Sequence, residues 1–320
     1  MDRVLKIGSR GSPLALRQVE MVREALAREF PELETELVVI TTSGDWKPED
    51  GEVRLEACAG GKAQFAKEIE EALSAGEIDA AVHSMKDMDS FLPEGLVIDH
   101  MLPREDVRDC LLFSNSLSKD SQFEKGDLSA IPEGAVIGTT SVRRGAFIKA
   151  ERPDVDLEVF RGNVQTRIDK VRAGQVDVTM LAMAGLKRLG IADEADVVLD
   201  VDAFLPAAAQ GAVGIEVRGN DEKILSIFSR ISDLNTVFCV KAERSALRTL
   251  NGGCHSPIAA YAVMDSDEMW LRVRVASEDG IQVFEDEIRG NVTSVEDAQK
   301  LGQEIGSRMK EIIPAGILKD

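Results

Sequence analysis

Short apolar runs alternate with amphipathic stretches of helical spacing along the first two thirds of the chain. Val4–Ile7 and Leu37–Thr41 are such runs, typical of buried strands. The stretch between them has the apolar period of a helix, and Ser12 is its predicted N-cap. Lys62–Ala75 predicts a second helix. This alternation predicts parallel βαβ units, with helices on the sheet faces and ligands at the carboxyl ends of the strands.

One short motif occurs twice, each time between a predicted helix and a predicted strand. Ala75–Asp79 (AGEID) precedes the strand Ala80–His83, and Ala173–Asp177 (AGQVD) precedes the strand Val178–Ala182. The repeat favours two similar α/β domains that face each other across a cleft. Chance similarity of two short motifs is the alternative.

The pattern changes beyond Leu234. A helix is followed by alternating strands at Leu271–Val275 and Ile281–Phe284, and then by a helix at Val295–Ile312. This order is typical of a small α+β domain.

A further strand, Ala212–Val217, follows the Gly-, Ala- and Pro-rich segment Leu205–Gly211. Such a segment suits a crossover that returns the chain to its first domain. We therefore predict three domains: residues 1–103 with 211–230, residues 104–210, and residues 231–320.

The charge balance limits the partners of the protein. Its 38 Lys and Arg against 57 Asp and Glu give a net charge of −19, so a nucleic acid would meet a repulsive mean field. No apolar run approaches the ~18 residues expected of a membrane span, and the opening segment lacks the apolar core of an export signal. We expect a cytoplasmic protein that binds neither nucleic acid nor membrane.

Cysteine and histidine spacing predicts neither a metal site nor disulfides, because no Cys-x-x-Cys occurs and no histidine stands at ligand spacing. His83 lies in an apolar strand without an acidic neighbour, which favours a core histidine over a catalytic base. The cysteines and histidines of the chain are Cys58, Cys110, Cys239, Cys254, His83, His100 and His255.

Arginines stand at three predicted strand ends. In Ala135–Gly145 (AVIGTTSVRRG), Arg143 and Arg144 follow a Gly/Thr/Ser turn that leads into a helix. Arg10 lies in a similar turn after the first strand, and Arg161 lies in another. Guanidinium groups and turn N–H groups bind carboxylate or phosphate oxygens without a metal, so the three turns predict one shared anion site.

His83-Ser84-Met85-Lys86-Asp87 ends a buried strand, where α/β sheets present their working groups. A carboxylate fixed at Asp87 could stabilise a cation that develops on a ligand. The alternative is a solvated Lys86–Asp87 pair at the start of a loop.

Two glycines precede Cys254 in the segment Asn251–Pro257. Their backbone N–H groups could point at the sulfur and favour a thiolate. The composition alone favours the other interpretation, a buried structural cysteine after a helix. Lys62, Arg167 and Arg188 are weaker candidates, because charged helix residues are usually solvated.

Seven blocks in order resemble the porphobilinogen deaminase family, also called the hydroxymethylbilane synthases. They span essentially the whole chain: SRGSPLAL (9–16), AVHSMKD (81–87), GTTSVRR (138–144), RGNVQTR (161–167), LAMAGLKRLG (181–190), QGAVGIE (210–216) and GGC (252–254).

The resemblance implies an enzyme that joins four porphobilinogen molecules head to tail, releases ammonia at each step and frees hydroxymethylbilane with water. It implies a dipyrromethane cofactor, held by a thioether to Cys254, and a monomeric protein. Asp87 is implied as the catalytic group. The resemblance assigns cofactor binding to Lys86, Asp87, Ser141, Arg143, Arg144 and Arg188, and substrate binding to Arg10, Ser12, Lys62, Arg161 and Arg167.

The predicted fold is α/β, with two similar doubly wound domains around a cleft, as in type II periplasmic binding proteins, and a small C-terminal α+β domain. Such a fold also suits a non-catalytic protein that binds small anions. This alternative gives no role to Cys254 or to the third domain.

Overall fold

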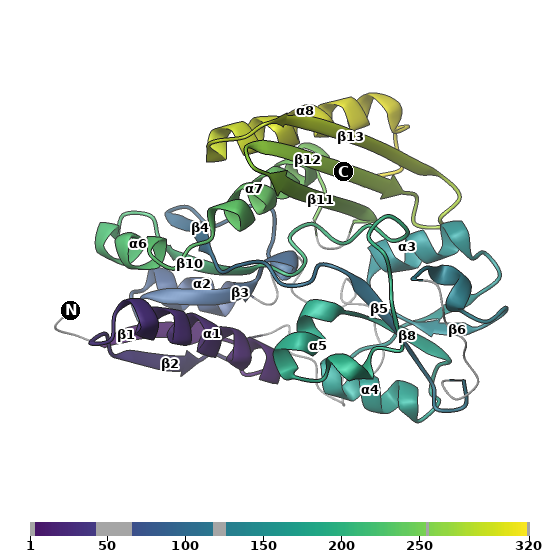
Figure 1. The fold of residues 1–320 in the computed structure, drawn as a ribbon, viewed down its shortest axis with the longest axis horizontal. Helices are drawn as coiled ribbons and strands as arrows, with labels where there is room; N and C mark the ends of the chain where they lie inside the picture. Colours follow the sequence, from purple (N-terminus) through teal and green to yellow (C-terminus); the bar gives the residue numbers. More distant parts are fainter. Residues whose placement is uncertain (1–3, 43–65, 118–125, 254–255, 319–320) are drawn as a thin grey trace.

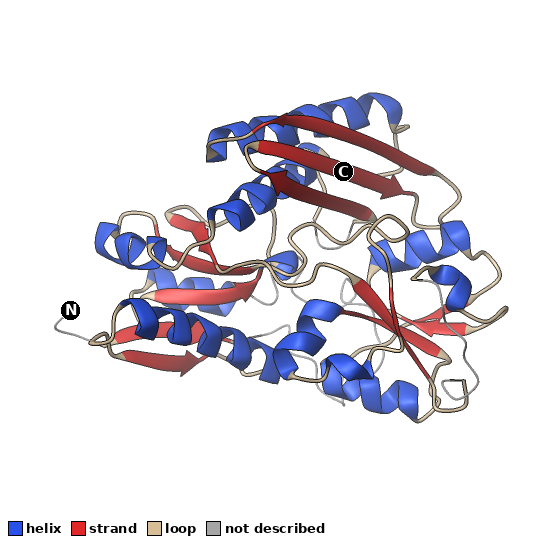
Figure 2. Cartoon of the chain, viewed as in Figure 1, coloured by secondary structure: helices blue, strands red, loops and turns tan. Residues whose placement is uncertain are grey.

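Three sheets organise the part of the chain that the structure describes. A computed structural model describes residues 4–42, 66–117, 126–253 and 256–318. Two five-stranded sheets lie side by side, and a three-stranded sheet lies beside both (Figure 1). Helices lie against the faces of all three sheets (Figure 2).

The first sheet has the strand order β2-β1-β3-β10-β4. β1, β2 and β3 are parallel, whereas β10 runs antiparallel to β3 and β4. Helices α1 and α6 cover one face, and α2 covers the other. The strands are β1 (Leu5–Ser9), β2 (Thr35–Val39), β3 (Ala80–Ser84), β4 (Leu96–Met101) and β10 (Val213–Arg218), and the helices are α1 (Pro13–Glu29), α2 (Lys67–Ser74) and α6 (Glu222–Ser229).

The second sheet repeats that order as β7-β6-β8-β5-β9. β6 is parallel to β7 and β8, and β5 is the antiparallel strand. Helix α3 packs on one face, and α4 and α5 pack on the other. The strands are β5 (Asp109–Phe113), β6 (Val136–Gly138), β7 (Asp156–Glu158), β8 (Val178–Ala182) and β9 (Val197–Val198), and the helices are α3 (Val142–Glu151), α4 (Val164–Arg172) and α5 (Met183–Leu189).

The repeated motif has the same role in both halves. Gly76 and Gly174 follow α2 and α4 with φ of 75° and 79°, the left-handed conformation that ends a helix. The Asp79 carboxylate accepts a hydrogen bond from a backbone N–H of β1 (2.9 Å), and Asp177 accepts one from β6 (2.8 Å). The shared strand order and these shared bonds confirm the prediction of two similar doubly wound units, in the type II periplasmic-binding-protein arrangement.

The C-terminal unit is an antiparallel sheet covered by two helices, as an α+β domain requires. Its strands are β11 (Ile258–Asp265), β12 (Glu268–Ala276) and β13 (Val283–Asn291), and α7 (Leu234–Thr249) and α8 (Val295–Ile312) pack together against them. The predicted α8 is confirmed at both ends. The predicted boundaries between the three domains stay a prediction.

Some predicted strands were wrong in position. Strand β11 was not predicted, because its first residues (IAAYA) are mostly small and have low strand propensity. It also placed a strand at Ile281–Phe284, but Ile281 is 81% exposed in the turn and β13 begins at Val283. Helix α2 begins at Lys67 within the described residues, and the predicted helical residues 62–65 lie outside them.

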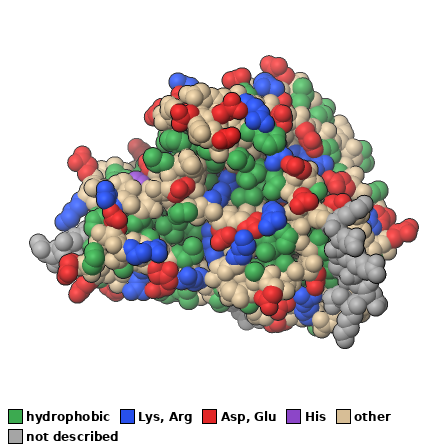
Figure 3. Space-filling view, in the orientation of Figure 1, with side chains coloured by type: hydrophobic (Ala, Val, Ile, Leu, Met, Phe, Trp, Pro, Cys, Tyr) green, Lys and Arg blue, Asp and Glu red, His purple; other side chains and the backbone are tan. Residues whose placement is uncertain are grey.

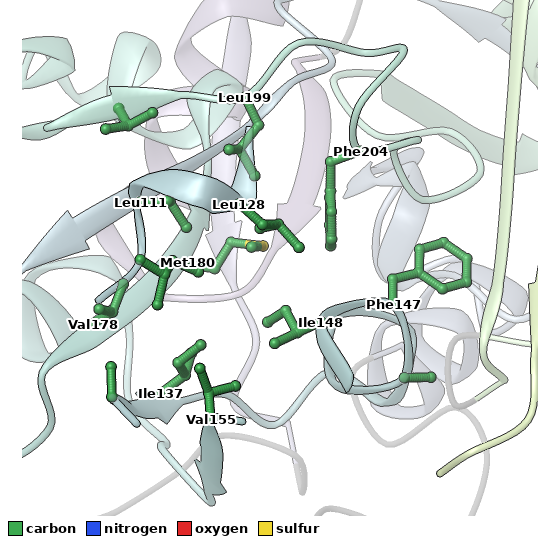
Figure 4. Packing of buried hydrophobic residues seen from close by; sticks show 14 of the residues in the cluster. Leu111, Leu128, Ile137, Phe147, Ile148, Val155, Val178, Met180, Leu199 and Phe204 are labelled. Atoms are coloured by element: carbon green, nitrogen blue, oxygen red, sulfur yellow. The ribbon is translucent and has the colours of Figure 1, made fainter. Parts of the chain in front are cut away.

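The core of the second unit continues into the third sheet. Phe147 and Phe204 meet edge to face, with ring centroids 6.0 Å apart and planes at 74° (Figure 4). Ala259 of β11 and Ala276 of β12 belong to the same buried cluster. The C-terminal sheet is therefore packed against the second unit rather than tethered loosely to it.

A buried ion pair joins α7 to the segment between β4 and β5. The Glu243 carboxylate is fully buried and accepts hydrogen bonds from Arg104 Nη1 (2.6 Å) and Nη2 (3.0 Å). It also accepts bonds from the backbone N–H groups of Ala209 (2.6 Å) and Ala262 (2.8 Å). One carboxylate thus ties together four separate segments of the chain.

We predict that Glu243→Gln lowers the free energy of unfolding by roughly 3–5 kcal/mol, because it leaves Arg104 buried without its counter-charge. Urea denaturation measures the loss. Glu268→Gln is the matched control, since its pair with Arg289 is exposed and worth at most ~1 kcal/mol. Equal losses in the two variants would contradict the assignment.

Candidate active site

A cavity of about 1040 Å³ lies between the two α/β units. Ten of the twelve predicted site residues line it: Arg10, Ser12, Lys86, Asp87, Ser141, Arg143, Arg144, Arg161, Arg167 and Arg188. The other two, Lys62 and Cys254, lie outside the described residues. In Figure 3, basic side chains show near the middle of the visible face, together with acidic ones.

Equivalent strand-to-helix turns supply the polar groups. Ser12 caps α1 by accepting a hydrogen bond from the backbone N–H of Ala15 (3.3 Å), and Ser141 caps α3 in the same way. Asn163, which caps α4, also lines the cavity. Three helix N-termini therefore meet at the cavity, and each favours an anion there.

The carboxylate of Asp109, on β5, forms ion pairs with both Arg143 and Arg144. This carboxylate is fully buried and lies 2.6 Å from Arg143 Nη2 and 2.6 Å from Arg144 Nη2. Gln210 Nε2 donates a third hydrogen bond to it (3.0 Å). Burial alone would raise the pKa of Asp109, but the charges of Arg143 and Arg144 outweigh burial and lower it. The carboxylate is thus a permanent counter-charge inside the site.

The remaining Nη atoms of the two arginines are also bonded. Arg143 Nη1 donates to the carbonyl of Leu205 (2.9 Å), and Arg144 Nη1 donates to that of Met180 (2.7 Å). The prediction of two guanidinium forks open to a ligand is wrong for these Nη atoms, and Asp109 was not predicted as their partner. A signal was available, because a charged residue inside a buried strand requires a cationic partner.

Lys86 and Asp87 form the short 3-10 helix that follows β3, residues Met85–Asp87. Asp87 is exposed toward the cavity, and Lys86 is half-buried. Burial lowers the pKa of Lys86 to about 8, and Arg144 and Arg143 add to this effect, while Asp87 opposes it. No ion pair joins these two side chains within the described residues, and the alternative of a solvated pair stays a prediction.

Two further predicted arginines, Arg167 and Arg188, are anchored to backbone carbonyls. Arg167 Nε donates to Gly162 (3.0 Å), and Arg188 Nη2 donates to Gly211 (2.6 Å). Burial lowers the pKa of Arg188 to about 10. Such anchors fix the direction of each guanidinium group before a ligand arrives.

His83 has an acidic partner, Glu216, which was not predicted from the sequence. Its Nε2 lies 3.0 Å from Glu216 Oε2 of β10, and both side chains are buried. Glu216 also acts on a second acidic residue, Glu70 on α2. Burial, with a smaller effect of Glu216, raises the pKa of Glu70 to about 7. The prediction of a core histidine is confirmed, because His83 does not line the cavity.

Three further findings concern metal binding, membrane spans and free cysteines among the described residues. Within residues 4–42, 66–117, 126–253 and 256–318, no group of three or more Cys, His, Asp or Glu is arranged to hold a metal. Every helix of these residues is too short or too polar to cross a bilayer. Cys110 and Cys239 are free and buried, and burial raises the pKa of each thiol to about 12.

The sequence matches two family descriptions. "Porphobilinogen deaminase, dipyromethane cofactor binding domain" covers residues 5–226, and "Porphobilinogen deaminase, C-terminal domain" covers residues 237–311. The chain belongs to the porphobilinogen deaminase family. It is therefore a transferase of tetrapyrrole biosynthesis with a dipyrromethane cofactor, and not the non-catalytic anion-binding protein that was the alternative.

Similar porphobilinogen deaminases come from bacteria and plants. That of Nitrobacter hamburgensis is 41% identical over 97% of this chain and 94% of its own, and that of Acidithiobacillus ferrooxidans is 41% identical over 100% and 99%. The chloroplastic porphobilinogen deaminase of Pisum sativum is 43% identical over 96% and 81%. An ancestral cationic amino acid solute-binding protein of known structure aligns at 17% identity and a TM-score of 0.44, over 71% of this chain and 88% of its own.

The cavity fits the dipyrromethane of a porphobilinogen deaminase. Each pyrrole ring of that cofactor carries carboxylates, and the cavity presents cationic side chains to them. Three buried Nε atoms, of Arg143, Arg144 and Arg188, lack a hydrogen-bond partner within the described structure. Buried donors of this kind require an acceptor, and ligand carboxylates would supply it.

We predict that Lys86 loses its proton near pH 8, whereas an ordinary lysine does so near 10.4. Because burial disfavours the ammonium form, the cavity loses one positive charge as the pH rises through 8. NMR titration of protein with labelled lysines measures the inflection, and Lys86→Met identifies the resonance. A set of lysine signals that all titrate above about pH 10 would contradict this assignment.

Proposed function

We propose that this enzyme condenses four porphobilinogen molecules head to tail and then releases hydroxymethylbilane by hydrolysis. In each step the aminomethyl carbon loses ammonia and bonds to the free α-carbon of the terminal ring, which loses a proton. The observation that carries the proposal is the cavity lined by arginines at the strand ends of both units. Every added ring brings two carboxylates, and a cationic cavity neutralises them.

Cofactor binding is proposed for Lys86, Ser141, Arg143, Arg144 and Arg188, with Cys254 as the thioether anchor. The anchored dipyrromethane supplies the ring carbon to which the first porphobilinogen is added. The chain contributes fixed donors, and each charge-assisted hydrogen bond to a carboxylate is worth roughly 1.5–3 kcal/mol. Planar guanidinium forks match carboxylates better than ammonium groups do.

Asp87 is the proposed catalytic group. Its carboxylate faces the cavity on the turn after β3, where it can accept pyrrole N–H bonds and stabilise the cation that forms as ammonia leaves. An opposite charge ~4 Å away is worth roughly 4 kcal/mol at an effective dielectric near 20. Arg10, Ser12, Lys62, Arg161 and Arg167 are the proposed binders of the incoming substrate carboxylates.

We further propose that the protein is a cytoplasmic monomer with three domains, residues 1–103 with 211–230, residues 104–210, and residues 231–320. The net charge of −19 supports a freely soluble protein that does not bind nucleic acid.

Intact-protein mass spectrometry tests the cofactor assignment. Protein made where porphobilinogen is available should exceed the 34.8 kDa chain by the mass of one dipyrromethane. Cys254→Ser should have the bare mass. Cys239→Ser, the matched control at a buried thiol, should keep the increment. A bare mass for the parental protein would overturn the proposal.

Replacing Asp87 by Asn should slow ammonia release from porphobilinogen by about a hundredfold or more, since the amide removes the charge that stabilises the cation. Asp89→Asn is the control, because Asp89 lies on the same loop without lining the cavity. The cofactor content of both variants is measured by mass. Near-parental release by a fully loaded Asp87→Asn enzyme would refute the role.

A further inference from the structure

A second cavity lies outside the proposed active site. It has a volume of about 160 Å³ and is enclosed by the loop after β3, by strand β4 and by helix α7. No described residue lines both cavities. Its presence is not explained by the condensation reaction.

One side of this cavity is cationic. Lys241, Arg244 and Arg248 lie three and four residues apart, and therefore on one face of α7. None of its described lining residues is acidic. Lys241 reaches outward to Asp99 (2.6 Å), and Arg244 donates to the carbonyls of the loop after β3.

Arg248 is the member of this face without a partner. Its side chain is half-buried, and it makes no hydrogen bond or ion pair within the described structure, unlike its two neighbours. Burial lowers the pKa of Arg248. A guanidinium group that has lost part of its hydration without gaining an acceptor is unfavourable, and an anion in the cavity would remove this penalty.

The opposite side of the cavity is apolar. Its accessible apolar surface comes from Phe91, which stands at the rim with 72% of its surface exposed, and from half-buried Leu92. Met85, Ile98 and Met101 pack behind them and are almost fully buried. An apolar protein cavity of about 150 Å³ is large enough for benzene. The available volume therefore admits a ring-sized apolar body with one charged group.

We propose that this cavity binds a small monocarboxylate, with its carboxylate on Arg248 and its apolar body on Phe91 and Leu92. Phe91 covers the bound body from the rim. The proposal concerns a second ligand site and goes beyond the condensation of pyrroles.

The position of the site connects it with the active-site loops. Ser90, in its wall, donates a buried hydrogen bond to the carbonyl of Gly252 (2.9 Å), two residues before Cys254. Met85 directly precedes Lys86 and Asp87. A ligand here would brace the first α/β unit against α7 and stabilise the loop after β3.

The test uses the cofactor-loaded enzyme and four probes: benzoate, 4-fluorobenzoate, benzyl alcohol and inorganic phosphate. Fluorine NMR of 4-fluorobenzoate and thermal unfolding report binding. We expect benzoate to bind and to raise the unfolding temperature with concentration. Benzyl alcohol, which has the same body without the charge, should bind about tenfold more weakly or worse.

Arg248→Gln should weaken benzoate binding about tenfold or more and leave pyrrole condensation near the parental rate. Phe91→Ala should weaken benzoate binding and leave phosphate binding unchanged. Arg289→Gln, an exposed arginine on β13, is the matched control and should change neither.

Two results would overturn the proposal. Benzoate binding that is lost in Arg188→Gln and kept in Arg248→Gln would place the ligand in the large cavity. Phosphate binding as tight as benzoate binding would show that the apolar residues of the cavity do not contribute to ligand affinity. Neither result affects the cofactor mass of the parental enzyme, so a failure here is distinct from a failure of the proposed function.

Discussion

The active site depends on one buried carboxylate between two guanidinium groups. Asp109 lies 2.6 Å from both Arg143 and Arg144, and all three side chains are buried. Two adjacent cations in a low-dielectric site repel each other strongly, and the carboxylate between them removes most of that repulsion. Asp109, Arg143 and Arg144 together have one net positive charge, which attracts anionic ligands. The positions of the two arginines are fixed by the fold. This explains how a cationic cavity persists before any acidic ligand is bound.

The duplicated architecture determines where that charge is presented. In each α/β unit the strands end at turns that cap helices, and the two sets of turns face one cavity. Ser12 and Ser141 are equivalent caps in the two units, so helix N-termini from both contribute to the same site. Burial at this cavity, with a smaller effect of Arg144 and Arg143, lowers the pKa of Lys86.

Helix α7 links the first α/β unit and the segment after it to the C-terminal sheet through two kinds of contact. Glu243 binds Arg104 inside the protein, and Arg244 binds the loop that follows Asp87. Arg248 faces the second cavity with no partner of its own within the described residues. A single helix thus combines a structural ion pair, support for the loop of Asp87 and the cation of the proposed monocarboxylate site. In the sequence, Cys254 follows the end of this helix by five residues.

The sequence alone determined the features that depend on residues close together in the chain. Caps such as Ser12, the repeated Gly-x-x-Asp turn and the periodic helix at Val295–Ile312 were predictable because each is local, and the ordered motif blocks identified the family. Tertiary structure decided the rest. Asp109 meets Arg143 across 34 positions, and His83 meets Glu216 across 133. No local pattern encodes which buried charges pair over such separations, because only packed sheets bring them within hydrogen-bond distance.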